Sequence, residues 1–430
     1  MWKLLIPQGD FLMTGTAKEI IVGVVTSGDT NGYFSNGLSQ NALFLYKSLE
    51  KVPMVKPVLI FYPTYGLEWP SQMDIFGTTA YNLELFYEKY HLDVLLTVSN
   101  ALDPSIVQKF KKNNVKVVAV VYGNTYIMDQ EAMCFGDLLP ATEEKRNFAN
   151  RPLIRKEAGL DAVWLSPHFA WQKDYIMHRY SAPKAHVCPY IWGPELLLQQ
   201  YKQDPHYEKD GPFFRPGNPK NKNVFATEPN INVVKTSLFP FQAANLVVKR
   251  NNSDLNALLL FGSNHHRIHN KPARDYFTWA KISQDKKVFF EHRYKFSTIT
   301  KHGQVMFHHH FENGLNYTLL EAATLKLPVV HNSEFMPELG YYYKRANLTD
   351  AASQIEAALL HEERDDLEEY NKLCSKVVHK FHYANYDNVR GHQSLIANLL
   401  NPEIEPELPP YIVDLEYRLE HGDGYISPLG

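Results

Sequence analysis

The sequence has 430 residues, of which 44% are hydrophobic and 21% charged, with a formal net charge of -3. This composition excludes an intrinsically disordered or fibrous chain. Because one hydrophobic core rarely serves more than roughly 250 to 300 residues, we expect two domains. No apolar run approaches the ~18 residues of a membrane-spanning helix, and residues 1–13 lack a signal-peptide pattern. The three cysteines are too widely separated for a disulfide scaffold or a CxxC metal site, so we expect a cytoplasmic protein.

Short β-branched runs alternate with amphipathic stretches in the first half of the chain. This rhythm is typical of α/β layering with parallel strands. Residues 38–49 have apolar side chains at helical spacing and predict a helix. We expect an N-terminal extension over residues 1–17 and a first domain over residues 18–198. The strands predicted in it are residues 19–25, 57–62, 93–98, 115–122, 162–166 and 185–189.

The second half repeats the same rhythm after a change in composition. Residues 199–222 are rich in Gln, Lys, Asp, Pro, Gly and Asn and predict a linker. We expect a second domain over residues 223–400, with an acidic helical region from about residue 351, and a tail over residues 401–430 that packs back. Both domains are predicted to be doubly wound, with ligands at the carboxyl ends of the strands. The strands predicted here are residues 223–227, 257–262, 287–291, 304–308 and 328–331.

Basic residues are concentrated in one block of the chain. Residues 215–310 contain fifteen Lys or Arg and five Asp or Glu, a local net charge of +10. Such a block attracts phosphate groups, either on a small nucleotide or on a nucleic-acid backbone. For most of these residues the alternative is an ordinary solvated helix face.

The densest candidate site lies between residues 308 and 322. A strand ends near His309, Gly314 permits a close approach of the backbone, and a helix begins near Asn316. The free N–H groups of that turn, which includes Leu315 and Tyr317, would bind an anion. Glu321 lies about one turn into the helix, where its carboxylate would accept hydrogen bonds from a ribose diol. A role for His309 in hydrogen bonding to the sugar or the diphosphate is also expected.

This stretch resembles the C-terminal half of GT-B glycosyltransferases with the retaining two-glutamate signature, and the strand at residues 327–330 resembles that family's next element. The resemblance implies that Glu321 binds the ribose of a nucleotide sugar and that a first glutamate, eight positions before it with seven residues between, contacts the sugar. The position eight before Glu321 is Asn313, and Glu312 precedes it. Either residue therefore takes the sugar-contacting role.

A second resemblance covers most of the chain. It is similar to a mainly bacterial and phage-related domain-of-unknown-function family with a GT-B-like C-terminal half. This resemblance supports the fold and the use of a nucleotide sugar, and it gives no acceptor. The segments that carry it are residues 36–45, 189–192, 228–236, 312–317 and 331–333.

Further candidates lie where other strands end. After the first strand, the loop at residues 26–37 contains Gly32 and Gly37, and the resemblance places donor phosphates against such a loop. After the first strand of the second domain come Glu228 and Asn230, then Lys235, which would neutralise the leaving diphosphate. The other predicted participants are Arg293 as a second cation, and Asp29 and His168 as bases if the reaction inverts the sugar.

Nineteen histidines raise the question of a metal site. Side chains alternate along a strand, so His308 and His310 should point one way and His309 the other. Two histidines alone do not make a metal site, which needs at least three ligands. We therefore expect no metal and no other cofactor, as the GT-B resemblance also implies.

The predicted fold class is thus α/β, a GT-B fold of two Rossmann-like domains with parallel sheets facing a cleft. The predicted function is a hexosyl- or pentosyltransferase that moves a sugar from a nucleoside diphosphate sugar, UDP-sugar favoured, to an acceptor hydroxyl with retention. A glycan is the leading acceptor. The alternatives are a phage-type transferase acting on hydroxymethylated pyrimidines in DNA, a sugar-nucleotide epimerase, and a non-catalytic module that binds nucleotide or glycan.

Overall fold

The computed structural model describes residues 19–27, 33, 37–62, 70–84, 91–98, 102–135, 159–203, 222–251, 254–265 and 270–413. The predicted extension at residues 1–17, most of the predicted linker and the last part of the tail lie outside these residues. So do two predicted site residues, Asp29 and Gly32.

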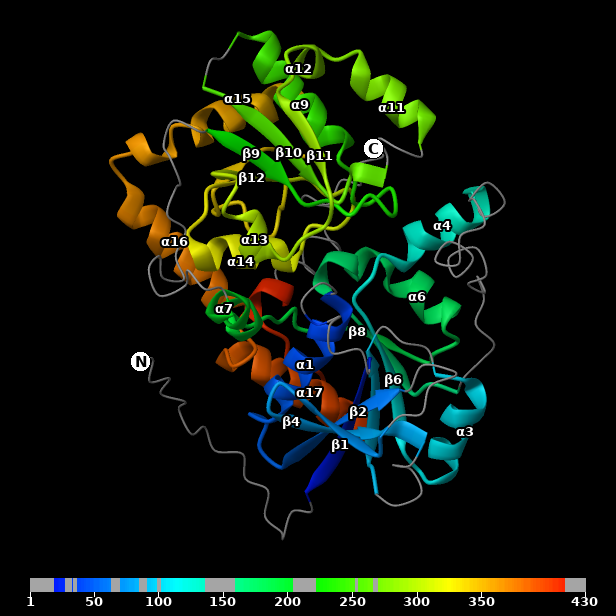
Figure 1. The fold of residues 1–430 in the computed structure, drawn as a ribbon. Helices are drawn as coiled ribbons and strands as arrows, with labels where there is room; N and C mark the ends of the chain where they lie inside the picture. The colour runs from blue at the N-terminus through cyan, green and yellow to red at the C-terminus, as the bar shows by residue number, and fades with distance from the viewer. Residues whose placement is uncertain are drawn as a thin grey trace. The chain divides into compact units, whose positions relative to one another are not determined.

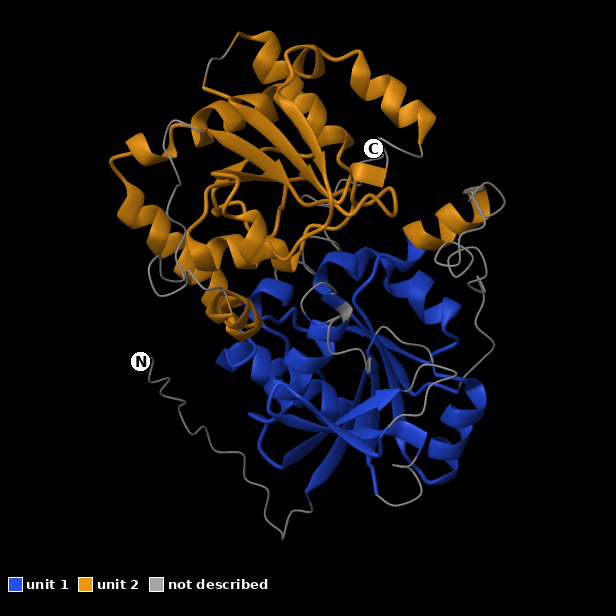
Figure 2. Ribbon diagram, in the orientation of Figure 1, with its two compact units in different colours: residues 1–126, 140–192, 381–426 blue, residues 127–139, 193–380, 427–430 orange. Residues whose placement is uncertain are grey.

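The chain divides into two compact units, coloured separately in Figure 2. Unit 1 contains residues 1–126, 140–192 and 381–426, and unit 2 contains residues 127–139, 193–380 and 427–430. This division differs from the predicted boundaries, because the second domain was expected to run to residue 400. The final helix, α17 (Tyr386–Leu400), belongs to unit 1 instead.

Unit 1 is built on a sheet of eight strands in the order β3-β4-β2-β1-β5-β6-β7-β8. All neighbours pair in parallel except β3 and β4, which form a hairpin. The central strands are buried runs of β-branched and leucine side chains, as parallel strands covered on both faces require. The strands are β1 (Ile20–Ser27), β2 (Val55–Tyr62), β3 (Gln72–Ile75), β4 (Thr78–Asn82), β5 (Val94–Val98), β6 (Lys116–Val121), β7 (Ala162–Leu165) and β8 (Ala185–Val187).

Helices flank this sheet, as the labels in Figure 1 show. Helix α1 packs on β1 and β2 and against α17. The buried Ser48 hydroxyl of α1 lies 2.9 Å from His392 Nδ1 of α17. The helices of this part of the chain are α1 (Gly37–Leu49), α3 (Pro104–Lys112), α4 (Thr125–Phe135), the 3-10 helix η2 (Pro167–Gln172) and α6 (Lys173–Arg179).

Residues of the C-terminal segment 381–413 also form hydrogen bonds with the rest of unit 1. Trp192 N donates to Phe381 O at 2.7 Å, and Tyr190 N donates to the hydroxyl of Tyr411 at 3.2 Å. Lys184 Nζ lies 2.7 Å from Asn398 Oδ1. The predicted packing of the tail is confirmed for Tyr411, and the residues after Val413 lie outside the described part of the chain.

Unit 2 is built on a parallel sheet of six strands in the order β11-β10-β9-β12-β13-β14. One core cluster joins the faces of β9, β10 and β12 to α9 and α15. The strands are β9 (Asn223–Ala226), β10 (Ala257–Phe261), β11 (Val288–Glu291), β12 (Val305–His308), β13 (Val329–His331) and β14 (Tyr341–Tyr342). The helices are α7 (Glu195–Lys202), α9 (Leu238–Lys249), α11 (Lys271–Thr278), α12 (Lys281–Gln284), α13 (Phe296–Ile299), α14 (Tyr317–Leu325), α15 (Leu348–Ala358), η3 (His361–Glu363) and α16 (Leu367–Lys380).

The predicted α/β class with two doubly wound sheets is therefore confirmed. In each sheet the strands that come next in sequence are added on one side of the first strand, and the later strands are added on its other side. The strand order reverses between β1 and β5 in unit 1 and between β9 and β12 in unit 2. Ligands of doubly wound folds bind at the carboxyl ends of strands at such a switch point.

Candidate functional site

Three buried side chains meet at the switch point of unit 2. Glu228 follows β9, His308 is the last residue of β12, and His310 lies two residues further. Glu228 Oε2 lies 2.8 Å from His310 Nε2, and Glu228 Oε1 lies 3.3 Å from His308 Nδ1. The two imidazole rings are 3.9 Å apart between centroids. We call Glu228, His308 and His310 the switch-point triad.

The triad is almost completely removed from solvent. The exposed fractions are 1% for Glu228, 3% for His308 and 5% for His310. Burial raises the pKa of Glu228, and the nearby His308 and Lys235 oppose this rise. Burial lowers the pKa of both histidines well below the usual value. The histidines are therefore neutral at neutral pH and carry nitrogen lone pairs.

The loop after β9 is held in place by Asn230. Its backbone has a φ of 54°, a left-handed conformation that asparagine tolerates better than most residues. Asn230 Nδ2 donates to Glu228 O at 2.7 Å and to Ser237 Oγ at 2.8 Å, and Asn230 Oδ1 accepts from Ser237 N at 2.7 Å. Asn230 N also donates to Lys235 O at 3.1 Å. Asn230 thus fixes the backbone of both Glu228 and Lys235.

Two further residues align the backbone of the triad. Gly262, after β10, has a φ of +77°, and a Cβ there would lie 3.2 Å from Glu228 O, so glycine is required beside the Glu228 backbone. The side chain of Asn332 forms two hydrogen bonds with the backbone of His310: it accepts from the N–H at 3.1 Å and donates to the carbonyl at 2.8 Å. The sequence gives no sign of either role, because both depend on which strands are neighbours.

The structure distinguishes Asn313 from Glu312. Asn313 is 7% exposed, and its side-chain nitrogen lies 2.9 Å from His310 Nδ1. Glu312 has a φ of 49°, and its carboxylate lies in the field of Glu334 and Arg345. Burial and then Glu334 raise the pKa of Glu312 to about 7. Of the two residues at the shifted signature position, Asn313 is the one that contacts the triad.

Three more predicted residues interact electrostatically around the triad. Burial lowers the pKa of Lys235, an effect that Glu228 opposes and Arg293 reinforces. Burial raises the pKa of Glu321, on α14, to about 7, and Arg293 opposes that rise. Burial lowers the pKa of Arg293, and Glu321 again opposes the shift. Two carboxylates and two cations of unit 2 are thus brought within each other's field.

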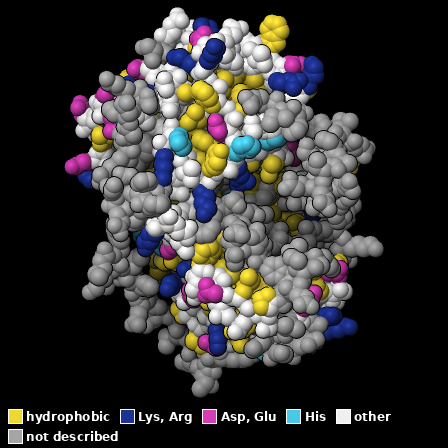
Figure 3. Space-filling model, in the orientation of Figure 1, with side chains coloured by type: hydrophobic (Ala, Val, Ile, Leu, Met, Phe, Trp, Pro, Cys, Tyr) yellow, Lys and Arg dark blue, Asp and Glu magenta, His cyan; other side chains and the backbone are white. Residues whose placement is uncertain are grey.

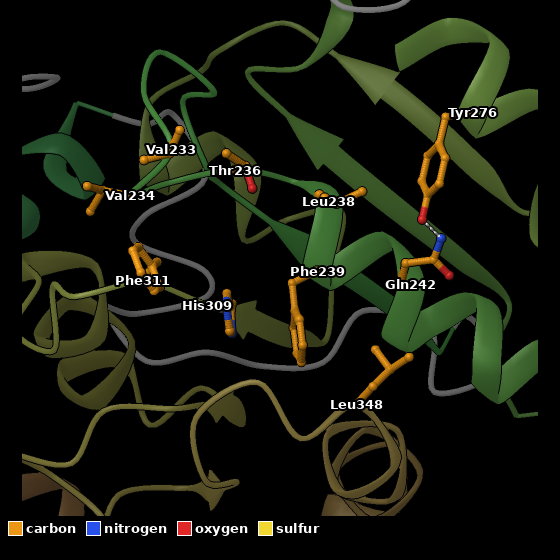
Figure 4. Close-up of a pocket in the computed structure, with 10 residues that line it drawn as sticks. All are labelled: Val233, Val234, Thr236, Leu238, Phe239, Gln242, Tyr276, His309, Phe311 and Leu348. Carbon is orange, nitrogen blue, oxygen red and sulfur yellow. Dashed lines mark hydrogen bonds between the residues drawn. The ribbon is translucent and has the colours of Figure 1, made fainter. Parts of the chain in front are cut away.

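His309 points to the other side of β12, as side-chain alternation predicts. Its ring stacks on Phe239 at 3.9 Å between centroids and an angle of 14°, and its Nδ1 lies 2.7 Å from the hydroxyl of Tyr343. Figure 4 shows His309 and Phe239 lining an apolar pocket together with Phe311 and Leu348. His309 therefore belongs to this pocket and lies apart from the triad.

The turn between β12 and α14 has structural roles at each predicted position. A Cβ on Gly314 would lie 2.8 Å from the ring of Phe335, so this glycine makes room for a side chain. Asn316 caps α14 by accepting from Thr318 N at 2.9 Å. Leu315 and Tyr317 are buried, with exposed fractions of 2% and 8%.

In unit 1, only two of the predicted site residues can be described. Gly37 is the exposed first residue of α1. His168, in η2, is 2% exposed, and its Nδ1 lies 3.0 Å from Ser166 Oγ. Its ring packs between Phe169 and Tyr190. It follows β7, which lies two strands away from β5 at the switch point of this sheet.

Among the described residues of the basic block, several cations are paired with carboxylates. Lys222, Arg250, Lys271 and Lys281 each form an ion pair with a carboxylate. On the face drawn in Figure 3, Lys and Arg side chains are scattered among hydrophobic and other side chains. For these four residues the ordinary reading, a solvated and paired surface charge, is the correct one.

Two properties concern the chain as a whole. Among the described residues, no helix combines the length and apolarity needed to cross a membrane. The cysteines, Cys134, Cys188 and Cys374, are all described and all free.

Solved structures that are similar to this chain include glycosyltransferases of the GT-B fold. A trehalose-6-phosphate synthase is 10% identical, with 90% of this chain and 100% of that chain covered and a TM-score of 0.56. A UDP-forming α,α-trehalose-phosphate synthase from Burkholderia xenovorans is 11% identical, with 89% and 100% covered and a TM-score of 0.54. A sucrose-phosphate synthase from Thermosynechococcus elongatus is 12% identical, with 89% and 100% covered and a TM-score of 0.50. These similarities establish the GT-B fold.

Residues 20–396 match the protein family of unknown function DUF2827, and the chain belongs to this family. The predicted resemblance to a GT-B-like domain-of-unknown-function family is thereby confirmed. No curated protein matches the sequence significantly.

Proposed function

We propose that this protein is a glycosyltransferase that takes a sugar from a nucleoside diphosphate sugar and holds this donor on unit 2. The observation that carries the proposal is a series of electrostatic neighbours in unit 2: Glu228, which follows β9 at the switch point, with Lys235, Lys235 with Arg293, and Arg293 with Glu321. Two cations suit a diphosphate, and a carboxylate on the helix that follows suits a ribose diol.

Each residue has a defined part in this proposal. Glu321 accepts hydrogen bonds from the ribose hydroxyls. Lys235 and Arg293 neutralise the diphosphate as the bond between the anomeric carbon and the phosphate oxygen breaks. An anion next to Lys235 raises its pKa again, so the bound donor keeps the lysine protonated. Asn313 takes the sugar-facing position, because it is fixed beside the triad whereas Glu312 lies with Glu334 and Arg345.

The donor and the stereochemistry follow from the resemblance and the fold neighbours. We favour a UDP-sugar, since one neighbour of the same fold is named as UDP-forming. We favour retention, in which the new bond joins the acceptor oxygen to the anomeric carbon and the acceptor proton passes to the leaving phosphate. The acceptor we favour is a glycan hydroxyl. A DNA acceptor is less favoured, because four cations of the basic block that could contact DNA phosphates are already paired with carboxylates.

A thermal-shift panel of UDP, GDP, ADP, CMP and dTDP tests the donor site. A nucleotide at 100 times its Kd stabilises a protein by roughly 2.7 kcal/mol. We expect one nucleotide to raise the Tm of the wild type and to lose most of this effect in Glu321→Ala. The matched control is Glu312→Ala, which removes another carboxylate with a raised pKa from the same segment and should keep the shift.

Turnover assays with the selected nucleotide's sugars separate the remaining classes. Release of the nucleoside diphosphate only when an acceptor is present supports a transferase. A new sugar nucleotide formed without acceptor would instead identify an epimerase, and a thermal shift without any turnover would identify a binding module. If no nucleotide shifts the Tm of folded wild-type protein, the proposal fails.

A further inference from the structure

The switch-point triad contains buried polar atoms that no described side chain or backbone group satisfies. Glu228 Oε1 and both ring nitrogens of His308 have no hydrogen-bond partner among the described residues. The 3.3 Å approach of His308 Nδ1 to Glu228 Oε1 is therefore a contact without a hydrogen bond. Leaving one buried polar group unpaired costs about 1 to 3 kcal/mol. Two of these atoms, Glu228 Oε1 and His308 Nδ1, lie 3.3 Å apart, at the position that a shared ligand would fill.

We propose that Glu228, His308 and His310 bind a divalent transition-metal ion of the Zn²⁺ type. A carboxylate oxygen and one nitrogen from each histidine lie within 4.8 Å of one another. Ligand atoms in a tetrahedral site with bonds of about 2.0 to 2.1 Å lie about 3.3 Å apart. The observed separation of 3.3 Å between Glu228 and His308 matches that value, and the 2.8 Å between Glu228 and His310 is about 0.5 Å shorter. Two neutral imidazoles and one carboxylate are a ligand set that such ions favour.

The surroundings of His310 fit a metal ligand. Its Nδ1 lies 3.2 Å from the backbone carbonyl of Asn313, which can accept a proton from that nitrogen. Nδ1 also lies 2.9 Å from the side-chain nitrogen of Asn313, and Nε2 is hydrogen-bonded to Glu228 Oε2 at 2.8 Å. A bound ion would replace this last hydrogen bond, with the imidazole proton placed on Nδ1 and donated to the carbonyl. Metal-binding histidines commonly hold their other nitrogen to a carbonyl or carboxylate in this way. Asn332 fixes the His310 backbone from the other side.

The ion would be held deep in unit 2, beside the ends of β9 and β12, and it would join these two strands. Lys235 is an electrostatic neighbour of all three ligands, and burial lowers its pKa, which favours its neutral form. Glu228 belongs both to this ligand set and to the residues that support the transferase proposal, but Glu321 and Arg293 are not ligands, so metal binding is measured without any nucleotide. It revises the expectation from the sequence that two histidines alone leave the site without a third ligand.

Metal content tests the site without any nucleotide or sugar. Purified full-length protein is stripped with a chelator, reloaded with Zn²⁺ or Co²⁺, desalted and analysed by elemental mass spectrometry. We expect about one ion per chain in the wild type. His308→Gln and Glu228→Gln should each weaken metal affinity by at least about tenfold, since even second-layer changes cost 10- to 100-fold. The matched control is His309→Gln, the adjacent histidine on the opposite face of the strand, which should retain the ion.

A Co²⁺ absorption spectrum of the wild type decides the matter even if a variant fails to fold. Intense visible bands of a tetrahedral site with nitrogen ligands support the proposal, and circular dichroism checks the fold of each variant. The proposal is overturned if the folded wild type retains no ion, if Co²⁺ shows only the weak spectrum of an all-oxygen octahedral complex, or if His309→Gln loses the ion as readily as His308→Gln. Because no nucleotide is present, each outcome is independent of the donor test.

Discussion

A buried histidine follows a strand in each unit, and the two differ in how their nitrogens are satisfied. His168 in unit 1 lies 3.0 Å from Ser166 Oγ and packs between two aromatic rings. His308 in unit 2 is equally buried, yet both of its nitrogens lack a partner among the described residues. The comparison teaches that burial and position after a strand do not mark a functional histidine. What separates the two histidines is the pair of unsatisfied nitrogens at the switch point of unit 2.

Truncating His168 should have the largest effect on stability. His168→Ala leaves a cavity between Phe169 and Tyr190 and removes a partner of Ser166, so we expect a loss of about 3 kcal/mol in the free energy of unfolding. Urea denaturation measures this loss. Nucleotide binding to the folded protein should stay unchanged, and a selective loss of binding with normal stability would contradict a structural role.

The pH dependence of stability should reveal Glu321. Its pKa is about 7 in the folded protein and 4.5 ordinarily, so between these values the folded state keeps a proton that the unfolded state has lost. The Glu321 contribution to stability therefore falls as pH rises from about 4.5 to 7. Each pKa unit corresponds to about 1.4 kcal/mol, and partial exposure reduces the total to about 2 kcal/mol.

Glu321→Gln removes this titration. Relative to the wild type, the variant should gain stability across that pH window, and urea denaturation at several pH values measures the difference. Histidines with lowered pKa values are common to both proteins and cancel. Parallel stability curves would show that Glu321 titrates normally.

Replacing His308 should have the smallest effect on the stability of metal-free protein. His308→Leu removes two nitrogens that lack a partner and places an apolar side chain in the same buried position. We therefore expect the free energy of unfolding to change by less than about 1 kcal/mol. Chelator-treated protein, unfolded in urea, gives the value. A loss as large as that of His168→Ala would mean that His308 is satisfied after all, and the contrast between the two units would disappear.

Most strands of the fold can be predicted from the sequence, because buried parallel strands consist of runs of β-branched and other apolar residues. The strands predicted at residues 57–62 and 257–262, for example, agree with β2 and β10 to within two residues. The hairpin of β3 and β4 was not predicted, because most of its residues are polar. Its turn is Phe76-Gly77, and both residues have a positive φ. The turn carries no Asn-Gly or Asp-Gly signal.

The place of α17 also escaped prediction. The helical pattern over residues 351–400 is correct in kind, and the structure divides it into α15, α16 and α17. An apolar stripe shows that one face of a helix is buried, and it does not show which sheet covers it. The pairing of α17 with α1 depends on contacts between residues more than 300 positions apart, such as Ser48 and His392.

The candidate site was predictable in part for the same reason. Alternation along β12 correctly separates His309 from His308 and His310. Glu228 comes from another strand, and only the order of the strands brings it to the two histidines. Gly314 was expected to face a ligand, but its Cβ position is occupied by Phe335, a neighbour that comes from the loop after β13.

The return of residues 381–413 to unit 1 has a consequence for protein synthesis. The ribosome completes every described residue of unit 2 up to Lys380 before it makes α17, although unit 1 begins the chain. The contacts of α1 with His392, of Lys184 with Asn398 and of Trp192 with Phe381 must therefore wait until residues 381–398 have been made. The surface of unit 1 that α17 covers therefore stays exposed until after unit 2 has been made. Unit 1 starts to be made first and is completed second.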